Sequence, residues 1–330
     1  MAGEGLEGLI LYTDVWRSGE VRYLSNFIPY WNQGLLLIPR QGESVLVTGL
    51  SARVHPWIRE TSSVATVATG PSIAVEAASQ IKRLGWKRIG VGELTAIPHG
   101  ILADLRANLQ GSELRDATEL LDALRDDSEP TALPLYRKAR EILGEGLGEV
   151  QASLPGKSGW QAAALLERAF RRRGATDTVI LLAPGAEPCW PAYPSDDALT
   201  ANGFVILSVE YKGHWVEIGR PLSSEGGGSG HTAKEAYPRV VAALRRDRSL
   251  ESVREEEARR GVLTEIMLGV AAMHRSFPSL PVDSLGEVPD GSVIALHLSG
   301  LDKAGRRSWW GETLVIERDH LSPLLPGGLP

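Results

Sequence analysis

A proline-containing segment near the middle of the chain separates two parts with different residue patterns. Residues 128–134 read SEPTALP, and acidic residues lie just before them. Proline interrupts regular secondary structure, so such a segment is typical of a linker between domains. A domain commonly has roughly 100–200 residues. We therefore predict two domains in this chain of 330 residues, 1–127 and 128–330, each with its own core.

The first part alternates strand and helix patterns, which predicts a small α/β domain with a mixed sheet. Apolar runs at 35–38 and 44–48 flank the turn PRQG and indicate a hairpin. Apolar residues recur at helical spacing over 72–84 and 101–109, and Gly85 is placed to end the first of these helices. Residues 9–12 and 88–93 are read as further strands.

The second part begins with helical patterns and ends with paired strands. Helices are predicted over 135–154 and 158–173 and near 233–246, 250–260 and 262–275. Strands are predicted at 176–182, 203–210, 214–220, 293–298 and 309–317, and a three-residue turn joins the second and third of them into a hairpin. The arginines at 171–173 are expected on a solvated helix face.

Composition and charge exclude several classes of protein. With 43% hydrophobic and 23% charged residues, the chain is too apolar for intrinsic disorder. Its formal charge of −6 argues against nucleic acid as a partner, since phosphate binding needs a basic face. Its single cysteine, Cys189, excludes an internal disulfide. No apolar run approaches the about 20 residues that span a membrane, and the N-terminus has acidic residues where a signal peptide is basic, so a cytoplasmic protein is expected.

Five segments in order resemble the creatinase, aminopeptidase P and methionine aminopeptidase family, whose catalytic domain has the pita-bread fold. They are RYLSNF at 22–27, ALR at 123–125 with YRKA at 136–139, EYKGHWVEIGR at 210–220, and the strands at 291–300 and 311–316. The resemblance implies a creatinase-type N-terminal α/β domain followed by an α+β pita-bread domain. It also implies a homodimer.

The metal centre is where the chain departs from this family. Family metallopeptidases hold two metal ions with two Asp, one His and two Glu. By the resemblance, the Asp positions fall on Ile206 and Glu217, and the Glu positions fall on His297 and Gly311, next to Glu312. The family's histidine segment has no counterpart before residue 293. Because too few ligands remain for a dinuclear centre, no metal and no other cofactor is expected.

Creatinase is a metal-free member of the family and also places a glutamate at the position of Glu217. It cleaves a C–N bond with a histidine as acid and base, but the corresponding loop here, 185–194, has no histidine. The resemblance therefore implies a displaced proton-transfer group, and Glu217, His297 and Glu312 are the candidate catalytic residues. The alternatives are a structural salt bridge of Glu217, for instance with Arg220, and a structural role for His297 in the core.

Aromatic residues concentrate in the segments that line the family's cavity. Their indole and phenol rings suggest an aromatic-walled pocket for a flat or cationic small molecule, or they fill the space that the metals vacated. The candidate substrate-binding residues are Trp190, Tyr193, Trp215, Trp310 and Arg220, together with Tyr30 and Trp31, which in creatinase-like dimers would reach the partner's site. Cys189 is a candidate nucleophile or an inert loop residue.

Three functions remain open at this point. The leading hypothesis is a metal-independent enzyme that cleaves or rearranges a C–N bond of a small nitrogen-containing molecule. The second is a catalytically inactive relative of the peptidases that binds a peptide or protein partner. The third is an Xaa-Pro-type metallopeptidase, which Ile206 and the missing histidine segment disfavour.

Overall fold

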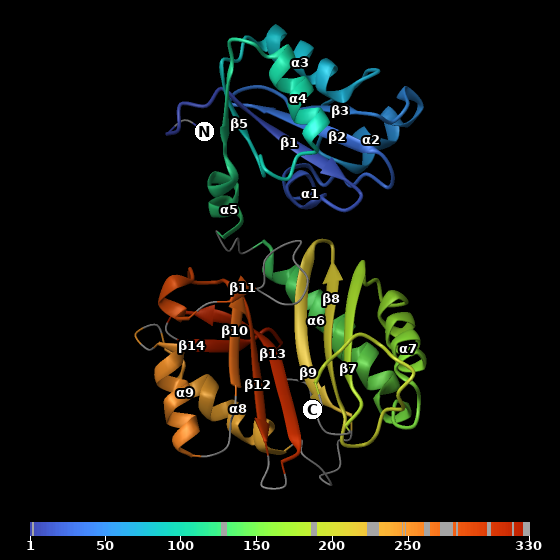
Figure 1. Cartoon of the computed structure of the whole chain (residues 1–330), viewed down its shortest axis with the longest axis vertical. Coiled ribbons are helices and arrows are strands. Elements are labelled where there is room, and N and C mark those ends of the chain that lie inside the picture. The colour runs from blue at the N-terminus through green and yellow to red at the C-terminus, as the bar shows by residue number, and fades with distance from the viewer. Residues whose placement is uncertain are drawn as a thin grey trace. The chain divides into compact units, whose positions relative to one another are not determined.

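The computed structural model describes residues 1, 3–126, 131–185, 190–222, 231–245, 247, 249–260, 265–270, 280–281, 283–301, 305–318 and 320–325. The chain forms two compact units, Met1–Arg125 and Asp126–Pro330, and each is described by itself (Figure 1). The boundary expected between residues 127 and 128 lies in 127–130, outside the described residues.

The first unit is built on a six-stranded sheet with the strand order β4-β3-β2-β1-β5-β6. Its strands are β1 (Gly8–Asp14), β2 (Gln33–Pro39), β3 (Val45–Thr48), β4 (Thr66–Thr69), β5 (Arg88–Val91) and β6 (Glu113–Asp116). Its helices are α1 (Gly19–Ser25), α2 (His55–Thr61), α3 (Ile73–Leu84), α4 (His99–Asn108) and α5 (Thr118–Asp126). The sheet is mixed, as predicted, because β1 pairs antiparallel with β2 and parallel with β5.

Both faces of this sheet are covered by helices. Along β1, Ile10 joins the core formed with α3 and α4, whereas Leu9 and Leu11 join the core on the other face. This alternation follows from the period of two along a strand. The predicted hairpin is confirmed as β2–β3, and α3 begins after Ser72, whose side chain caps it, and ends at Gly85 with φ of 72°.

The second unit is built on an eight-stranded sheet with the order β11-β10-β12-β13-β9-β8-β7, and β14 pairs with β13. Its strands are β7 (Asp177–Ala183), β8 (Phe204–Tyr211), β9 (His214–Pro221), β10 (Glu265–Val270), β11 (Leu280–Pro281), β12 (Val293–Leu301), β13 (Arg307–Glu317) and β14 (His320–Pro323). Its helices are α6 (Leu133–Val150), α7 (Gly159–Arg171), α8 (His231–Ala243) and α9 (Leu250–Arg259).

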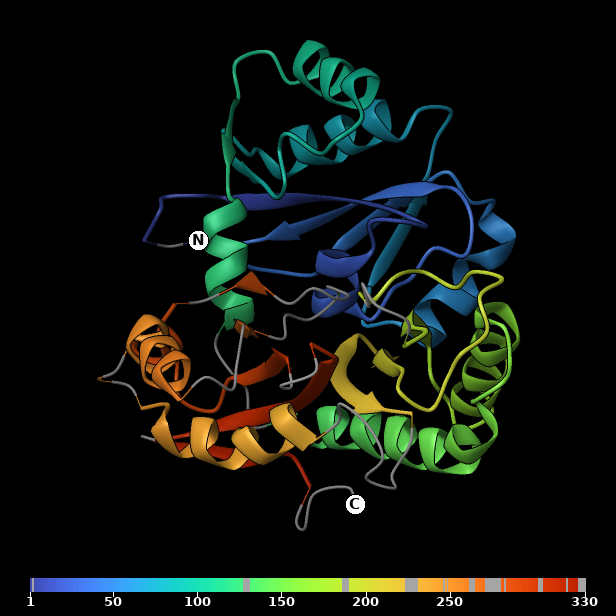
Figure 2. The same ribbon diagram turned by 60° about the horizontal axis from the view of Figure 1, so that its bottom comes forward.

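These four helices lie along one face of the second sheet (Figure 2). One core joins α6 and α7 to β7, β8 and β9, and a second joins α8 and α9 to β10, β12 and β13. Val216 and Ile218 point into the first core, and Leu296 and Leu314 point into the second. We call this side of the sheet the helix face, and the side toward which the alternate residues point the site face.

The glycines of α6, which weaken a helix by propensity, have a packing role. A Cβ on Gly146 would lie 2.4 Å from the ring of Phe170 on α7, so glycine allows the two helices to approach closely. Ser158 begins α7 with a capping box, in which its hydroxyl accepts from the Gln161 N–H.

The helix predicted near 262–275 is wrong for its central part. Residues 265–270 form β10, which pairs with β12 from Glu265–Ser299 to Val270–Ile294. Ile266 and Leu268 alternate into the second core, so burial follows a period of two, and pairing with the neighbouring strand outweighs local helix propensity. Residues 261–264 and 271–275 lie outside the described residues.

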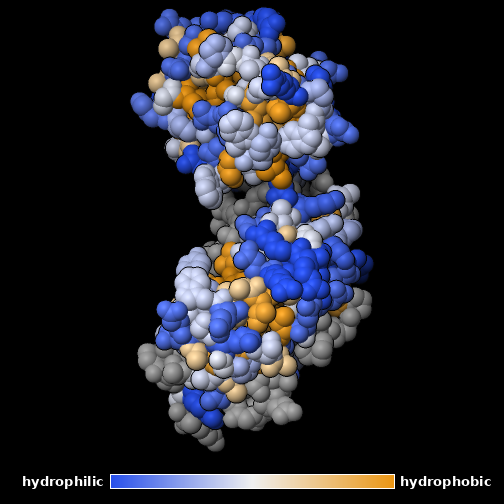
Figure 3. Space-filling model, turned by 90° about the vertical axis from the view of Figure 1, so that its right-hand side faces the viewer, coloured by the Kyte–Doolittle hydropathy of each residue, from blue (hydrophilic) through white to orange (hydrophobic). Residues whose placement is uncertain are grey.

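The arginines at the end of α7 are paired at the surface, as expected for a solvated helix face. Arg171 contacts Glu167 and Asp177, and Arg173 contacts Glu149. Figure 3, viewed from this side, shows hydrophilic side chains gathered on the second unit. None of the helices that the structure describes combines the length and apolar character needed to cross a membrane.

Candidate active site

Two glycines join the halves of the second sheet. Gly219 of β9 and Gly311 of β13 form the register pair between these strands. A Cβ on Gly311 would lie 2.1 Å from Nδ1 of His297, and a Cβ on Gly219 would lie 2.4 Å from the indole of Trp309. Glycine at both positions therefore makes room for the rings of His297 and Trp309 on the site face.

Glu217 and His297 meet beside these glycines. Nε2 of His297 lies 3.3 Å from Oε2 of Glu217, and both side chains are about 95% buried, at 5% and 4% exposure. The indole Nε1–H of Trp309 donates to Nδ1 of His297 at 3.1 Å. An indole N–H can only donate, so Nδ1 is an acceptor and the neutral ring carries its proton on Nε2, the nitrogen nearer Glu217. This arrangement is called the Glu217–His297 dyad below.

The backbone of Glu217 is fixed by a side chain of the neighbouring strand. The hydroxyl of Thr313 accepts a hydrogen bond from the Glu217 N–H and donates one to the Glu217 carbonyl oxygen, each at 2.7 Å. The hydroxyl thus supplies the contacts that a strand partner would otherwise make. It holds the carboxylate at one place along β9.

The position at which the resemblance implied the first aspartate is apolar. Ile206 packs in a buried cluster with Phe204 and Trp309, whose rings stack at 5.5 Å and 17°. Gly311 offers no ligand, and the His297 ring fills the space that a side chain there would need. Within the residues that the structure describes, no group of three or more His, Cys, Asp or Glu could hold a metal ion. The donor set therefore does not fit the dinuclear centre that the family's metallopeptidases hold.

Glu312, expected as a third catalytic group, lies on the opposite side of the sheet. Its carboxylate receives hydrogen bonds from Arg140 of α6, at 2.5 Å from Nε and 2.8 Å from Nη2, and a further one from Arg220. Although burial raises the pKa of Glu312, these two guanidinium groups hold it below its ordinary value. The expectation that Glu312 joins Glu217 is corrected, because consecutive strand residues point to opposite faces.

Arg220 and Trp310, expected to bind substrate, also lie on the helix face. The guanidinium carbon of Arg220 lies 4.1 Å from the centroid of the Trp310 ring, and the group also donates to the carbonyl oxygens of Gly219 and Gly311. The open alternative of a Glu217–Arg220 salt bridge is replaced by the Arg220–Glu312 pair. Arg220 and Trp310 therefore lie on the opposite face of the sheet from the Glu217–His297 dyad.

The remaining substrate-binding candidates fall in three places. Trp215 is buried on the site face by alternation with Glu217. Trp190 is half exposed and Tyr193 is exposed on the loop before β8. Tyr30 and Trp31 belong to the first unit, where they form an exposed aromatic cluster with Trp57. Cys189 lies outside the described residues.

Two polar side chains of the site face were not identified from the sequence. Ser208 lies opposite Glu217 in register, and its fully buried hydroxyl has no hydrogen-bond partner among the described residues. Arg307 donates to the hydroxyl of Ser299 at 2.6 Å, and its guanidinium carbon lies 3.7 Å from the centroid of the Trp190 ring. The period of two along a strand could have identified both residues. Ser208 is opposite Glu217 in the β8–β9 hairpin, and Arg307 is two residues before Trp309 on β13.

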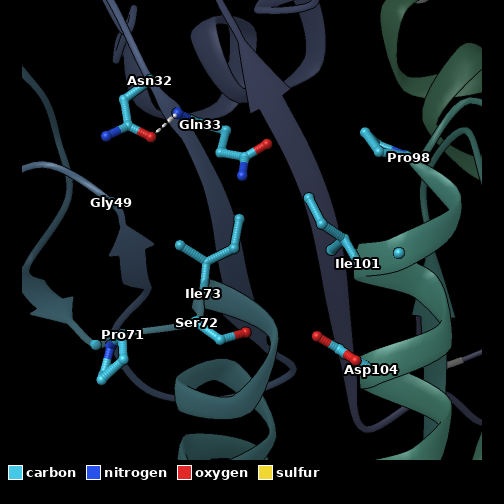
Figure 4. Close-up of a pocket in the computed structure, with 11 residues that line it drawn as sticks. Asn32, Gln33, Gly49, Pro71, Ser72, Ile73, Pro98, Ile101 and Asp104 are labelled. Atoms are coloured by element: carbon cyan, nitrogen blue, oxygen red, sulfur yellow. Dashed lines mark hydrogen bonds between the residues drawn. The ribbon is translucent and has the colours of Figure 1, made fainter.

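The first unit contains a pocket of about 580 Å³ (Figure 4). It lies at the carboxyl ends of β3 and β4 and beside the starts of β2, α3 and α4. Its polar lining comprises the amides of Asn32 and Gln33, the hydroxyl of Ser72 and the carboxylate of Asp104, and Ile73 and Ile101 supply apolar walls. This edge is where α/β sheets commonly bind ligands, but the sequence did not point to it.

The comparisons with known proteins agree with this architecture. Residues 1–126 match the family model of the creatinase/prolidase N-terminal domain. The whole chain superposes on the Xaa-Pro dipeptidase of Bacillus anthracis with a TM-score of 0.79 at 17% identity, covering 100% of this chain and 95% of that one. A search of curated protein sequences finds no match.

Other solved structures give the same result. The X-Pro aminopeptidase of Thermotoga maritima has a TM-score of 0.81 at 16% identity, covering 99% of this chain and 97% of that one. The prolidase of Pyrococcus horikoshii has 0.76 at 17%, covering 98% and 95%. The chain thus has the pita-bread fold. Its first unit matches the creatinase/prolidase N-terminal domain.

Proposed function

We propose that this protein is a metal-independent acid–base enzyme that cleaves or rearranges a C–N bond in a small nitrogen-containing molecule. The observation that carries the proposal is a buried series of three groups: the Trp309 indole donates to Nδ1 of His297, and Nε2 of His297 lies 3.3 Å from the Glu217 carboxylate. This arrangement suits proton transfer, because a carboxylate and an imidazole are in contact and a third group fixes the imidazole through its other nitrogen, Nδ1.

The direction of proton transfer follows from the donor at Nδ1. Because the indole N–H occupies Nδ1 of His297, a proton cannot be added there without breaking that hydrogen bond. Glu217 is therefore the proton acceptor, and its carboxylate lies 3.3 Å from Nε2 of His297. In hydrolysis, Glu217 takes a proton from water as the water oxygen forms the new bond to carbon, and protonated Glu217 gives this proton to the departing nitrogen as the C–N bond breaks.

A cation on the same face suggests that the substrate carries an anionic group. Ser299 and His297 are same-face neighbours on β12, about 7 Å apart along the strand, and Ser299 accepts a hydrogen bond from Arg307. Arg307 would bind a carboxylate, and Trp190 would form a wall beside it.

The structural neighbours support a hydrolase. They include the Xaa-Pro dipeptidase of Bacillus anthracis and the X-Pro aminopeptidase of Thermotoga maritima, and a metallopeptidase function is the competing hypothesis for this chain. Against it stand Ile206 and Gly311, which supply no ligand at the implied metal positions. The proposal therefore contains no step that requires a metal ion.

A screen of small amines, guanidines and N-acyl amino acids for release of ammonia, urea or free amine tests the proposed enzyme. Glu217→Gln should lower turnover by a factor of about 10² to 10⁴, the usual contribution of a general base, and Glu167→Gln on the exposed side of α7 is the matched control. Turnover that remains in both Glu217→Gln and His297→Ala variants would exclude the assignment. Hydrolysis of Xaa-Pro dipeptides that a chelator abolishes would establish the metallopeptidase.

The exposed aromatic cluster of the first unit favours a second candidate, the binding of a peptide or protein partner. Tyr30 and Trp31 are each 57% exposed and Trp57 is 41% exposed, and ring centroids of Tyr30 and Trp57 are 5.6 Å apart. Aromatic side chains of this kind are enriched at interfaces. A homodimer is the partner that the family resemblance favours. Sedimentation of the protein and of its Trp31→Ala variant distinguishes dimer formation through this cluster from a monomer.

A further inference from the structure

The helix face of the second sheet contains a buried group of charges that the proposed reaction does not use. Arg140, Arg220 and Glu312 have side chains that are 3%, 5% and 12% exposed. Two guanidinium groups therefore share one carboxylate away from water. Arg140 uses Nε and Nη2 for that carboxylate, and Arg220 directs its remaining described hydrogen bonds to two backbone carbonyls.

Two hydrogen-bond donors in this group are unsatisfied. Nη1 of Arg140 and the hydroxyl of Tyr237 are buried and have no hydrogen-bond partner among the described residues. The pKa of Tyr237 is raised well above its ordinary value, first by burial and then by the Glu312 carboxylate, whereas Arg220 and Arg140 oppose the rise. The phenol is therefore neutral and lies within electrostatic reach of all three charged groups.

Such an arrangement is unfavourable by itself. A buried donor without an acceptor costs free energy, and a buried excess of one positive charge adds a further penalty. Water would satisfy the donors but would leave the charge uncompensated. A small anion satisfies both requirements, and burial on the helix face excludes a large one.

We propose that Arg140 and Tyr237 form a binding site for a small monovalent anion of the size of chloride. Nη1 of Arg140 supplies the charged donor, and the Tyr237 hydroxyl supplies a neutral one. The anion brings the net charge of the group to zero. Arg220, which holds the Gly219–Gly311 pair, links this site to the opposite face of the sheet.

Thermal unfolding of the full chain in chloride tests the proposal. Sodium gluconate, whose anion is too large for the site, replaces sodium chloride at constant ionic strength. Chloride should raise Tm by about 5 °C with saturation over a hundredfold concentration range. Tyr237→Phe should weaken the apparent affinity about tenfold. Tyr211→Phe, which removes a half-buried hydroxyl elsewhere in the second unit, should leave the affinity unchanged.

A bromide-soaked crystal of the unmodified protein locates the ion without any substitution. An anomalous peak within hydrogen-bonding distance of both Arg140 Nη1 and the Tyr237 hydroxyl would support the proposal. A water molecule in that place, with no halide at any concentration that saturates the Tm response, would overturn it. So would a Tm that is equal in chloride and gluconate. None of these readouts depends on the proposed enzymatic activity.

Discussion

The ring of His297 occupies the space in which a side chain of Gly311 would have to lie. A Cβ on Gly311 would lie 2.1 Å from Nδ1, the atom that accepts a hydrogen bond from the Trp309 indole N–H. Glycine at 311 and histidine at 297 are therefore a matched pair. The family resemblance places a glutamate at each of these positions, and the structure shows that one change requires the other.

Gly311→Ala should separate this pair. The added methyl group forces the His297 ring away from Trp309, and we expect a loss of about 1–3 kcal/mol in the free energy of unfolding together with loss of any Glu217-dependent turnover. Urea unfolding measures the first effect. Gly148→Ala is the control, because that exposed helical glycine has no atom within 4 Å of its Cβ position and the change should stabilise α6 by up to about 1 kcal/mol. Equal stability of the two variants would contradict the packing argument.

Trp309→Phe should release the tautomer of His297. The phenyl ring retains most of the stack on Phe204 but has no N–H to donate to Nδ1. Nitrogen-15 chemical shifts of the imidazole should show the Nε2–H form in the unmodified protein and a mixture of both tautomers in the variant. Trp160→Phe, at an exposed position of α7, controls for the loss of an indole. An unchanged tautomer would mean that Trp309 does not determine where the proton lies.

Most of the helices and strands could be predicted because the signals for these elements are local, whereas the pita-bread fold was predicted from the family resemblance. Ser158 caps α7, Gly85 ends α3, and the hairpin turn between β8 and β9 follows directly from the pattern of residues 203–220. The strand β10 was not predicted, since its identity depends on pairing with β12, which is distant along the chain. Contacts of that kind are not encoded in a local period.

The candidate site was predicted only in part, for a reason that one residue illustrates. Glu312 is next to Gly311 in sequence, but adjacency on a strand reverses the direction of the side chain, and Arg140 of α6 pairs with it on the helix face. The contact of Glu217 with His297 follows from the register shared by Gly219 and Gly311. The contact of Arg307 with Trp190 depends on the path of a loop, which no residue pattern specifies.

Thr313→Val should loosen Glu217 without touching its carboxylate. The valine keeps the shape of the side chain but removes the hydroxyl that binds both the N–H and the carbonyl oxygen of Glu217. We expect a loss of about 1–3 kcal/mol in unfolding free energy, since two buried backbone groups lose their partner. Thr313→Ser, which restores the hydroxyl, should recover most of the loss. Denaturant unfolding of both variants makes the comparison, and an unchanged stability of Thr313→Val would show that the hydroxyl does not stabilise the backbone of Glu217.

Glu312→Gln should destabilise the protein at neutral pH and much less in acid. The pKa of Glu312 is lowered in the folded protein, so its ionised carboxylate contributes stability above its unfolded pKa, near 4.5, and this contribution disappears as the pH falls through the folded value. Removing the charge leaves Arg140 and Arg220 without a counterion, which costs about 3–5 kcal/mol for a buried pair. Urea midpoints of the two proteins should therefore differ most above the unfolded pKa and approach each other as the pH falls through the lowered folded pKa of Glu312. A difference between the midpoints that keeps the same size throughout this titration would show that shape, not charge, accounts for the role of Glu312.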